Sequence, residues 1–395
     1  MILTYLDDEG ERVHVYDANR SVLRSTGAFS CVLNAIEYHI ENSVLVEEMC
    51  KLVNNLIGNY DSEVWEDPWV RAYSLLLRSL QHHGSVLAIS YLVVRALFPI
   101  VTAVRDRVDV LKGMTAMLTA LPNHSNPNII FWELRVINCL GVGSNTWSML
   151  GKVGACGIVL HILHEYSEDA KIVEQGCWLL HSLATVEENS LRLGTECTYG
   201  FELLTALLKE HILTSAVVER ICCAVNNFSF NNSFNATRFG ESGILSLIVK
   251  CIKLHLDDAD VAYWCSSAIN NLVCNNSANL RIVGEISGCE TIVEMLKRFL
   301  THCAVAEQTC IVIQNLTFLD ANKMKLLEYH AVEVLESALK VHGAVNNPAR
   351  LNDQVVSNVG PEIVKALERL TGMIERSGDE KVCGIPIFSW FFGYP

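Results

Sequence analysis

The feature of this sequence that most constrains its fold is an internal repeat with a period of about 43 residues. The marker is the residue just before a Leu or Phe near the end of an apolar helical run. Arrays of stacked helical units have periods of this length, and they bury one continuous core along the array. The sequence therefore predicts a solenoid, which lacks a deep central cleft. The marker positions are Asn55, Ala96, Cys139, Ser182, Asn227, Asn271 and Asn315.

A second marker, a Gly that opens an apolar run, keeps the same period. Because Gly tolerates backbone conformations that interrupt a helix, we expect it to separate two helices of each unit. His330 takes the slot after the last Gly, and Trp69 lies in the gap between the first two. The Gly positions are Gly27, Gly113, Gly157, Gly200, Gly243 and Gly288.

The clearest unit covers about residues 233–276. We predict a short helix over residues 235–242, a second over 244–254 and a third over 261–275. The acidic run Asp257-Asp258-Ala259-Asp260 is expected to cap the third helix.

The following units should keep this order of helices. In the next unit we expect helices over residues 280–286, 292–300 and 304–319. An eighth unit is predicted from helices over 331–341 and 362–374, the latter opened by Pro361.

The two ends of the sequence differ from the repeat. Residues 1–26 are expected to form an N-terminal cap, in which apolar runs around Asp7-Asp8-Glu9-Gly10-Glu11 predict a short β-hairpin, with a frayed helix as the alternative. The solenoid is predicted over residues 27–375. Residues 376–395 are expected to form an aromatic tail, which the last repeat, a partner or a membrane would cover.

Composition excludes several classes. The 395 residues are 50% hydrophobic and 19% charged, which is too apolar for a disordered chain. The net charge of -14 argues against nucleic-acid binding, and it suits either a basic partner or plain solubility. The strongest apolar stretch, residues 91–101, contains Arg95 and Pro99 and is shorter than the roughly 18 residues of a membrane span. We therefore expect no membrane span, and the N-terminus shows no signal peptide.

The cysteine pattern and the absence of enzyme motifs predict a non-catalytic protein of a reducing compartment. Many of the 15 Cys fall inside apolar helical patterns without a CxxC pair, which predicts reduced thiols and a cytoplasmic protein, with the nucleus or a cilium as alternatives. No GxGxxG, P-loop or GxSxG is present, and His161 and His164 lack the order and third ligand of a zinc site. We expect no catalysis, metal or cofactor.

Three helices per unit, a Gly break and a third helix that ends in Asn-Leu resemble the armadillo repeat family. The residues that carry the resemblance are Gly200 with Asn227-Phe228, Gly243-Ile244 with Asn271-Leu272, and Gly288 with Asn315-Leu316. The resemblance covers about residues 110–340, with two-helix HEAT repeats as the rival. It implies an all-α, right-handed superhelical solenoid of about seven or eight three-helix repeats.

The resemblance also implies a binding site. In this family the third helices line a concave groove, and an Asn before the Leu hydrogen bonds the main chain of an extended peptide. A side-chain amide suits this role because it offers both a donor and an acceptor. The matching residues are Asn227, Asn271 and Asn315, and we expect Asn231 and Asn275 one turn later on the same helix face. The alternative is that these Asn end helices and satisfy local carbonyls.

Two further candidates come from the slot four residues before the marker. Import receptors of the family place a Trp there, and only Trp178 fits this pattern. Members with basic grooves place Lys or Arg on these faces, and Arg135 fits. The candidate partner-binding residues are therefore Arg135, Trp178, Asn227, Asn231, Asn271, Asn275 and Asn315.

These observations predict a non-catalytic adaptor or scaffold that holds a partner protein along the groove. The partner is expected to be an extended or partly basic segment, without nucleic acid or membrane. One alternative is a regulatory clamp on a chaperone, small GTPase or myosin. Another is a structural component of a ciliary or cytoskeletal assembly. The oligomeric state is left open.

Overall fold

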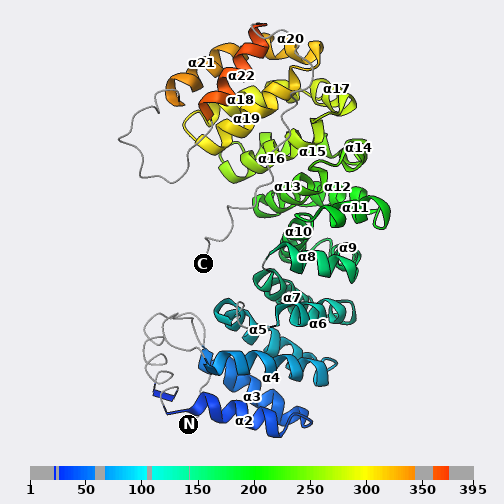
Figure 1. Cartoon of the computed structure of the whole chain (residues 1–395), viewed down its shortest axis with the longest axis vertical. Helices are drawn as coiled ribbons and strands as arrows, with labels where there is room; N and C mark the ends of the chain where they lie inside the picture. The colour runs from blue at the N-terminus through cyan, green and yellow to red at the C-terminus, as the bar shows by residue number, and fades with distance from the viewer. Residues whose placement is uncertain are drawn as a thin grey trace. The chain divides into compact units, whose positions relative to one another are not determined.

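The computed structural model describes residues 22–23, 26–57, 67–104, 109–141, 143–342 and 359–372. Every regular element in these ranges is helical, which confirms the all-α prediction there (Figure 1). The chain divides into two compact units, Met1–Ile162 and Leu163–Pro395, which we describe separately. The predicted hairpin and the tail over residues 376–395 lie outside the described residues.

The first unit contains helices that pack mainly in pairs. α2 packs on α3, α4 on α5 and α6 on α7, and α3, α5 and α7 also contact one another in sequence. In the described part of residues 28–140 the helices therefore form pairs, where the sequence predicted units of three helices. The helices are α2 (Ala28–Tyr38), α3 (Ser43–Ile57), α4 (Asp67–His83), α5 (Leu87–Val104), α6 (Val110–Ala120), η1 (Leu121–Asn123), α7 (Pro127–Leu140), α8 (Ser144–Lys152) and α9 (Ala155–Glu165).

One helix of this unit corrects an expectation about membranes. α5 has 18 residues and is long and apolar enough to cross a bilayer, so its apolar stretch is longer than predicted. If each bent helix pair counted as one span, α8 with α9 would be a second candidate among the described residues. Half of the α5 window is buried against protein, including Val93, Leu97 and Ile100. We therefore describe α5 as a core helix.

The second unit repeats the predicted order of a short first helix, a second helix and a long third helix. The third helices α10, α13, α16, α19 and α22 pack each against the next and form its spine. The helices are α10 (Ala170–Leu183), α11 (Glu187–Thr195), α12 (Gly200–Glu210), α13 (Ser215–Ser229), α14 (Ser233–Glu241), α15 (Ile244–Leu254), α16 (Ala259–Val273), α17 (Ser277–Glu285), α18 (Gly288–Arg298), α19 (Cys303–Leu316), α20 (Asp320–Glu328), α21 (Ala331–His342) and α22 (Val359–Thr371).

Local sequence explains where these helices begin. The Asp258 carboxylate accepts hydrogen bonds from the backbone N–H groups of Asp260 and Val261, as the acidic run predicts for an N-cap. Between the first and second helices the backbone turns left-handed, at Gly243 with φ 85° and at His330 with φ 60°. In the unit between them Ser287, with φ 61°, makes this turn instead of Gly288.

Some predicted helix ends are wrong. α16 ends at Val273 and α19 at Leu316, so neither reaches the predicted ends at 275 and 319. Asn231 and Asn275 follow their helices with φ 49° and 56°, so they do not lie on the helix face predicted for them. Asn tolerates this left-handed conformation better than most residues, and it therefore ends the helix that it was expected to continue.

Buried amides join consecutive units on the side of the first helices. Asn279 Nδ2 donates to the carbonyls of Ala236 and Leu272 at 2.8 and 2.7 Å, and Asn235 Nδ2 donates to those of Ser190 and Phe228 at 2.8 and 2.9 Å. Each amide thus links its own first helix to the first and third helices of the unit before it. Asn189 and Asn322 occupy the same position in their units and are also buried.

A glycine opposite three of these amides makes the approach possible. A Cβ on Gly240 would overlap with the side-chain oxygen of Asn279, and one on Gly284 would overlap with that of Asn322. Gly194 lies in the same way against Asn235. The distance between neighbouring first helices therefore depends on glycine here.

Histidines near the ends of second helices make a second set of bonds between units. Each ring donates through Nε2 to a backbone carbonyl of the unit before it, so the loops between second and third helices are also tied together. The bonds are His83 to Ile40 (2.6 Å), His211 to Ser167 (2.6 Å), His255 to Ile212 (2.8 Å) and His342 to Leu300 (2.6 Å).

The substitution Asn279→Ala tests the amide bonds. It removes two hydrogen bonds of a buried amide, so we expect the free energy of unfolding to fall by about 2 to 4 kcal/mol. Urea unfolding followed by circular dichroism measures this loss. Asn128→Ala, at an exposed position of α7, is the control and should change stability by less than about 0.5 kcal/mol. Equal effects of the two changes would contradict the structural role.

Candidate functional site

The candidate site is the row of third helices α10, α13, α16 and α19, which we call the third-helix face. Four of the predicted residues, Trp178, Asn227, Asn271 and Asn315, lie on these helices. The helices are deeply buried: every residue of α13 from Ile221 to Ser229 is buried. The site therefore consists of a few polar groups within a largely apolar layer.

The three marker asparagines are buried and bonded to the preceding unit. Asn271 Nδ2 donates to Asn226 at both its backbone oxygen (3.0 Å) and its Oδ1 (2.8 Å), and Asn315 Nδ2 donates to Asn270 Oδ1 at 2.5 Å. Asn227 Nδ2 donates to the backbone oxygen of His181 at 3.1 Å. Their amide nitrogens thus join neighbouring third helices, whereas the alternative interpretation expected bonds to local carbonyls. Binding of a partner by these residues stays a prediction.

The side chain of His181 also contacts Asn227. Its ring Nδ1 lies 3.0 Å from Asn227 Nδ2. Burial lowers the pKa of His181 to about 4, and the positive charge of Arg220 acts in the same direction. The ring is therefore neutral near pH 7. Depending on the tautomer, its Nδ1 accepts from Asn227 or donates to the backbone oxygen of Cys223, which lies 3.2 Å away.

The residue before each marker was missed by the sequence prediction. Asn226, Asn270 and Gln314 are amides with the same period, and all three are buried. Gln314 Nε2 continues the series by donating to the backbone oxygen of Glu362 at 3.0 Å and to its carboxylate at 2.8 Å. The signal was visible in the sequence as repeated amide doublets ahead of the Leu or Phe.

Two atoms of this series have no hydrogen-bond partner among the described residues. They are Asn270 Nδ2, a donor, and Gln314 Oε1, an acceptor, and they come from adjacent units. The side chains are each 1% exposed. A buried polar atom without a partner costs about 1 to 3 kcal/mol. A ligand could supply an acceptor and a donor to these two atoms, and so remove that cost, only where the side chains that cover them move aside.

Trp178 is not an open aromatic surface. The guanidinium carbon of Arg220, from the next third helix, lies 4.4 Å from the centroid of its ring. Arg220 also forms an ion pair with Glu219 at 3.3 Å. The chain's own Arg therefore occupies the face of Trp178 that a partner's cation would need.

Arg135 lies in α7 of the first unit and is engaged in a similar way. Its guanidinium carbon is 4.0 Å from the ring centroid of Phe98, 5.0 Å from that of Trp132 and 5.6 Å from that of Phe131. These cation–π contacts join α5 to α7. Arg135 therefore contributes to packing within its unit, and its predicted contact with a partner is not tested by the structure.

Acidic residues line one edge of the third-helix face. Glu174, Glu219 and Glu307 each lie about two helical turns before the marker of their helix. Burial raises the pKa of Glu219, against the opposing charge of Arg220, and the negative charge of Asp260 raises it further. An edge of this kind favours positively charged groups.

Burial likewise raises the pKa of Glu307, and the Glu362 carboxylate acts in the same direction. Glu219 and Glu307 are both half-buried and come from different units. Each carboxylate is therefore partly desolvated, a state that a cation nearby would stabilise.

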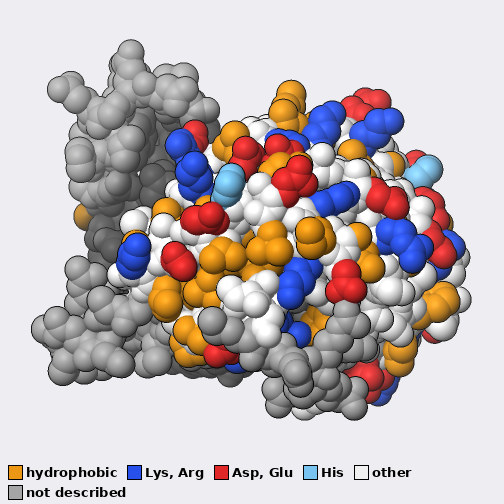
Figure 2. All heavy atoms as spheres, turned by 90° about the horizontal axis from the view of Figure 1, so that it is seen from above, with side chains coloured by type: hydrophobic (Ala, Val, Ile, Leu, Met, Phe, Trp, Pro, Cys, Tyr) orange, Lys and Arg blue, Asp and Glu red, His pale blue; other side chains and the backbone are white. Residues whose placement is uncertain are grey.

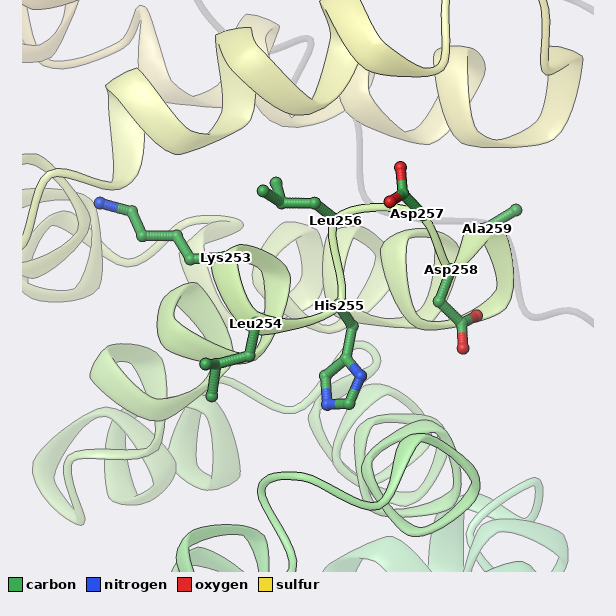
Figure 3. A pocket seen from close by; sticks show the side chains of 7 residues that line it. All are labelled: Lys253, Leu254, His255, Leu256, Asp257, Asp258 and Ala259. Atoms are coloured by element: carbon green, nitrogen blue, oxygen red, sulfur yellow. The ribbon is translucent and has the colours of Figure 1, made fainter.

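A shallow hollow of about 680 Å³ lies beside the loop between α15 and α16 (Figure 3). It is lined by residues 253–259. Three of its polar side chains have partners: His255 donates to Ile212, Asp258 caps α16, and Asp257 accepts from the Arg298 side chain. The hollow is thus a junction between units.

The buried cysteines of the described residues are poor candidates for a reactive centre. Cys222 and Cys265 approach to 3.7 Å between their sulfur atoms, and burial raises the pKa of the neighbouring Cys177 and Cys223 thiols, which disfavours the reactive thiolate. Thirteen described cysteines are free, whereas Cys274 is in a disulfide bond, so the expectation of reduced thiols fails at one position. The described residues contain no group of three or more His, Cys, Asp or Glu that could hold a metal ion.

A buried His–Glu pair lies in the first unit. His124 Nδ1 is 2.9 Å from Glu133 Oε2, and His124 Nε2 is 3.3 Å from the backbone oxygen of Gly84. Burial raises the pKa of Glu133, and the hydrogen bond to Glu133 raises that of His124. Both ring nitrogens contact protein oxygen, so the pair joins α7 to the chain before it.

This pair predicts a pH dependence of stability that Glu133→Gln should reduce. Both pKa values are raised by folding, so the folded state holds protons that the unfolded state has released. The contribution of each proton to the free energy of unfolding is complete below the ordinary pKa, 4.5 for Glu133 and 6.5 for His124. It is lost as the pH rises through the raised pKa of the folded state.

Urea unfolding of the unsubstituted chain and the Glu133→Gln variant between pH 4.5 and pH 8 measures this effect. As the pH rises, the free energy of unfolding of the unsubstituted chain should decrease relative to that of the variant. Glu210→Gln, at an exposed position of α12, should leave the profile unchanged. A difference that is constant with pH would exclude the assigned pKa directions.

Comparisons with known proteins support the fold. No family model matches the chain, and no curated protein matches it. Among solved structures, an engineered protein matches at TM-score 0.65 with 15% identity, over 90% of this chain and 91% of that chain. A second engineered protein matches at TM-score 0.54 with 19% identity, over 67% of this chain and 99% of that chain.

A structure from a study of the interaction between cadherin and beta-catenin is also similar. It matches at TM-score 0.49 with 15% identity, over 92% of this chain and 78% of that chain, and a likeness of this size carries no argument about function. At these identities the engineered proteins likewise support only the all-α repeat fold.

Proposed function

We propose that this chain is a non-catalytic adaptor or scaffold of the armadillo type, whose third-helix face binds an extended segment of a partner protein. The observation that carries the proposal is the pair of unpartnered buried atoms, Asn270 Nδ2 and Gln314 Oε1, on adjacent units. An extended peptide offers a carbonyl acceptor and an N–H donor in alternation. It can therefore satisfy both atoms without a requirement for particular side chains.

The acidic edge suggests the chemistry of the partner. Glu307 lies on α19 with Gln314, and Glu219 lies on α13, the neighbour of the helix that carries Asn270. Glu174 lies on α10, one helix further along the row. A segment with Lys or Arg beside its extended backbone would gain charge-assisted contacts there. The partner that fits best is thus an extended, partly basic protein segment, and the chain's net charge of -14 favours its approach.

A peptide-display selection against the full chain tests the proposal. We expect the selected peptides to be enriched in Lys and Arg and to bind the third-helix face. The double variant Asn270→Ala, Gln314→Ala should weaken their binding by about tenfold or more, because it removes two hydrogen bonds of roughly 1 kcal/mol each. Fluorescence anisotropy with labelled peptides measures the dissociation constant.

Asn322→Ala is the matched control, because Asn322 is an equally buried amide that bonds the unit before it from a first helix. It should lower stability without changing peptide affinity. The double variant also loses bonds between units, from Asn315 to Asn270 and from Gln314 to Glu362, so circular dichroism must first show that it folds. Peptides that bind the double variant as tightly as the unsubstituted chain would refute the proposal.

Peptide binding should also depend on pH. Because burial raises the pKa of Glu219 and Glu307, acidification neutralises them at a higher pH than the ordinary value of 4.5. Affinity for a Lys-containing peptide should therefore be full above their raised values and fall as the pH decreases through them. The measurement is the dissociation constant from pH 8 to pH 5 in the chain and in a Glu219→Gln, Glu307→Gln variant. An equally steep fall in the variant would exclude these carboxylates.

A further inference from the structure

One described cysteine, Cys274, is in a disulfide bond, and it lies at the end of a third helix. Cys274 directly follows α16, and its backbone N–H donates to the backbone oxygen of Asn270 at 3.0 Å. The chain has 15 cysteines, and thirteen of the described ones are free. The cysteine that remains is Cys383, so the disulfide ties the sequence beyond α22 to the end of α16.

The burial of the third-helix face is greatest around this anchor. On α16 the marker Asn271 and the residue one turn before it, Ser267, are both buried. On α10 the equivalent residues, Ser182 and Trp178, are half-buried, so a third helix of this row does not bury these two positions by itself. The equivalent residues that are buried on the helices beside α16 are Cys223 and Asn227 of α13, and Ile311 and Asn315 of α19.

The described helices do not account for this burial. Eleven consecutive residues of α16, 264–274, are buried, which is three full turns. A helix with one side open to water exposes residues at every turn, so α16 is enclosed on all sides over this stretch. The described helices that pack closely on it are α13 and α19 in the same row, and α14, α15 and α17.

Figure 1 shows α14 and α17 along one edge of the second unit and α16 toward the other. We call the side of α13, α16 and α19 that faces away from α14 and α17 the inner side. No described helix packs closely on the inner side of α16. Its burial therefore needs a cover from elsewhere in the chain.

The sequence after Cys383 supplies a segment of suitable character. Residues 385–395 read IPIFSWFFGYP and contain five aromatic rings and no charged side chain. Left in water, such a segment would expose a large apolar area. The twelve residues 384–395 span about 40 Å when extended, and packed helices lie about 10 Å apart. From an anchor at the end of α16, the segment can therefore reach α13 and α19.

Two other surfaces compete for this segment. The end of the second unit at α20, α21 and α22 carries hydrophobic side chains, but Figure 2, which views the molecule from that side, shows them among Lys, Arg, Asp and Glu. An uncharged segment would leave such charges covered and unpaired, which costs free energy. A second copy of the chain is opposed by the net charge of -14 on each copy. The inner side has uncharged residues at its two buried positions and begins about 6 Å, one helical turn, from the anchor.

We propose that residues 384–395, held by a disulfide between Cys274 and Cys383, cover the inner side of α13, α16 and α19, and that reduction of this disulfide opens the surface to a partner. The contact itself is apolar and aromatic. The statement about a partner rests on the function proposed for the third-helix face, because the segment then occupies the site that the partner would bind.

The opening step needs a dithiol as reductant. One thiolate of the dithiol attacks a sulfur of the disulfide and forms a mixed disulfide, and its second thiol then displaces the protein sulfur. The reductant becomes a disulfide, and its two electrons and two protons appear as the thiols of Cys274 and Cys383. Afterwards only residues 372–382 tether the segment, from the end of α22, so its effective concentration at the inner side decreases.

Photo-crosslinking in the full chain tests the contact without any partner. With p-benzoylphenylalanine in place of Phe391, irradiation of the oxidised chain should give a product of monomer mass. Mass spectrometry after proteolysis should place its crosslink between residue 391 and α13, α16 or α19. Prior treatment with dithiothreitol should lower the yield by about fivefold or more, because the longer tether lowers the effective concentration.

The other results of this experiment would overturn the proposal. They are a link to α20, α21 or α22, a link between two chains, no link within the chain, and a yield that reduction leaves unchanged. A proteolytic digest made without reductant should contain a peptide pair joined through Cys274 and Cys383. Its absence would overturn the assigned disulfide.

Substitution of single cysteines gives a matched comparison. Cys383→Ser should lower the crosslink yield as much as dithiothreitol does, and it should make the yield insensitive to dithiothreitol. Cys31→Ser, at an exposed free cysteine of α2, should behave as the chain without this substitution. Circular dichroism checks that both variants fold. If Cys383→Ser does not fold, the effect of dithiothreitol on the unsubstituted cysteines decides.

Peptide binding separates this inference from the proposed function. Peptides selected on the reduced chain should bind the oxidised chain about fivefold or more weakly than the Cys383→Ser variant. Equal affinity for both, with weaker binding to the Asn270→Ala, Gln314→Ala variant, would refute the inference and retain the proposed function. Peptides that bind away from the third-helix face would refute the proposed function, and the crosslink from residue 391 would still show that the segment covers the inner side.

Discussion

Hydrogen bonds from buried side-chain amides to the preceding unit are the interaction on which the second unit depends. Apolar burial supplies most of the driving force for stacking helices, but it has no direction and tolerates small slips. The amides of Asn235 and Asn279 each need two specific carbonyls, at 2.7 to 2.9 Å. A slip of one helix past another would leave these groups buried and unpaired, so the amides fix the register of the stack.

The same chemistry links architecture to the proposed function. Asn271 and Asn315 donate hydrogen bonds to neighbouring third helices. Asn270 and Gln314 each have one polar atom without a partner among the described residues. In the proposed function, the bonds between units would hold Asn270 and Gln314 in fixed positions relative to a partner. Rigid placement of this kind lowers the ordering cost of binding an extended segment.

The sequence predicted much of this fold because apolar spacing and Gly breaks act locally. The helix predicted over residues 244–254 and the acidic cap at Asp258 are confirmed. The ends near Asn231 and Asn275 were wrong because an Asn can either continue a helix or turn left-handed, and tertiary packing decides between them.

The site was harder to predict than the fold. Neighbouring residues on a helix point about 100° apart, so an Asn-Asn doublet does not reveal which amide meets the next unit. The Trp178 and Arg135 contacts depend on rings and guanidinium groups from other helices, which no local pattern records.

The glycines that face Asn279 and Asn322 have a further consequence for how such an array can change. Each junction consists of a hollow on one unit and an amide on the next, so a unit duplicated or transplanted within the chain would fit only between neighbours that carry the complementary halves.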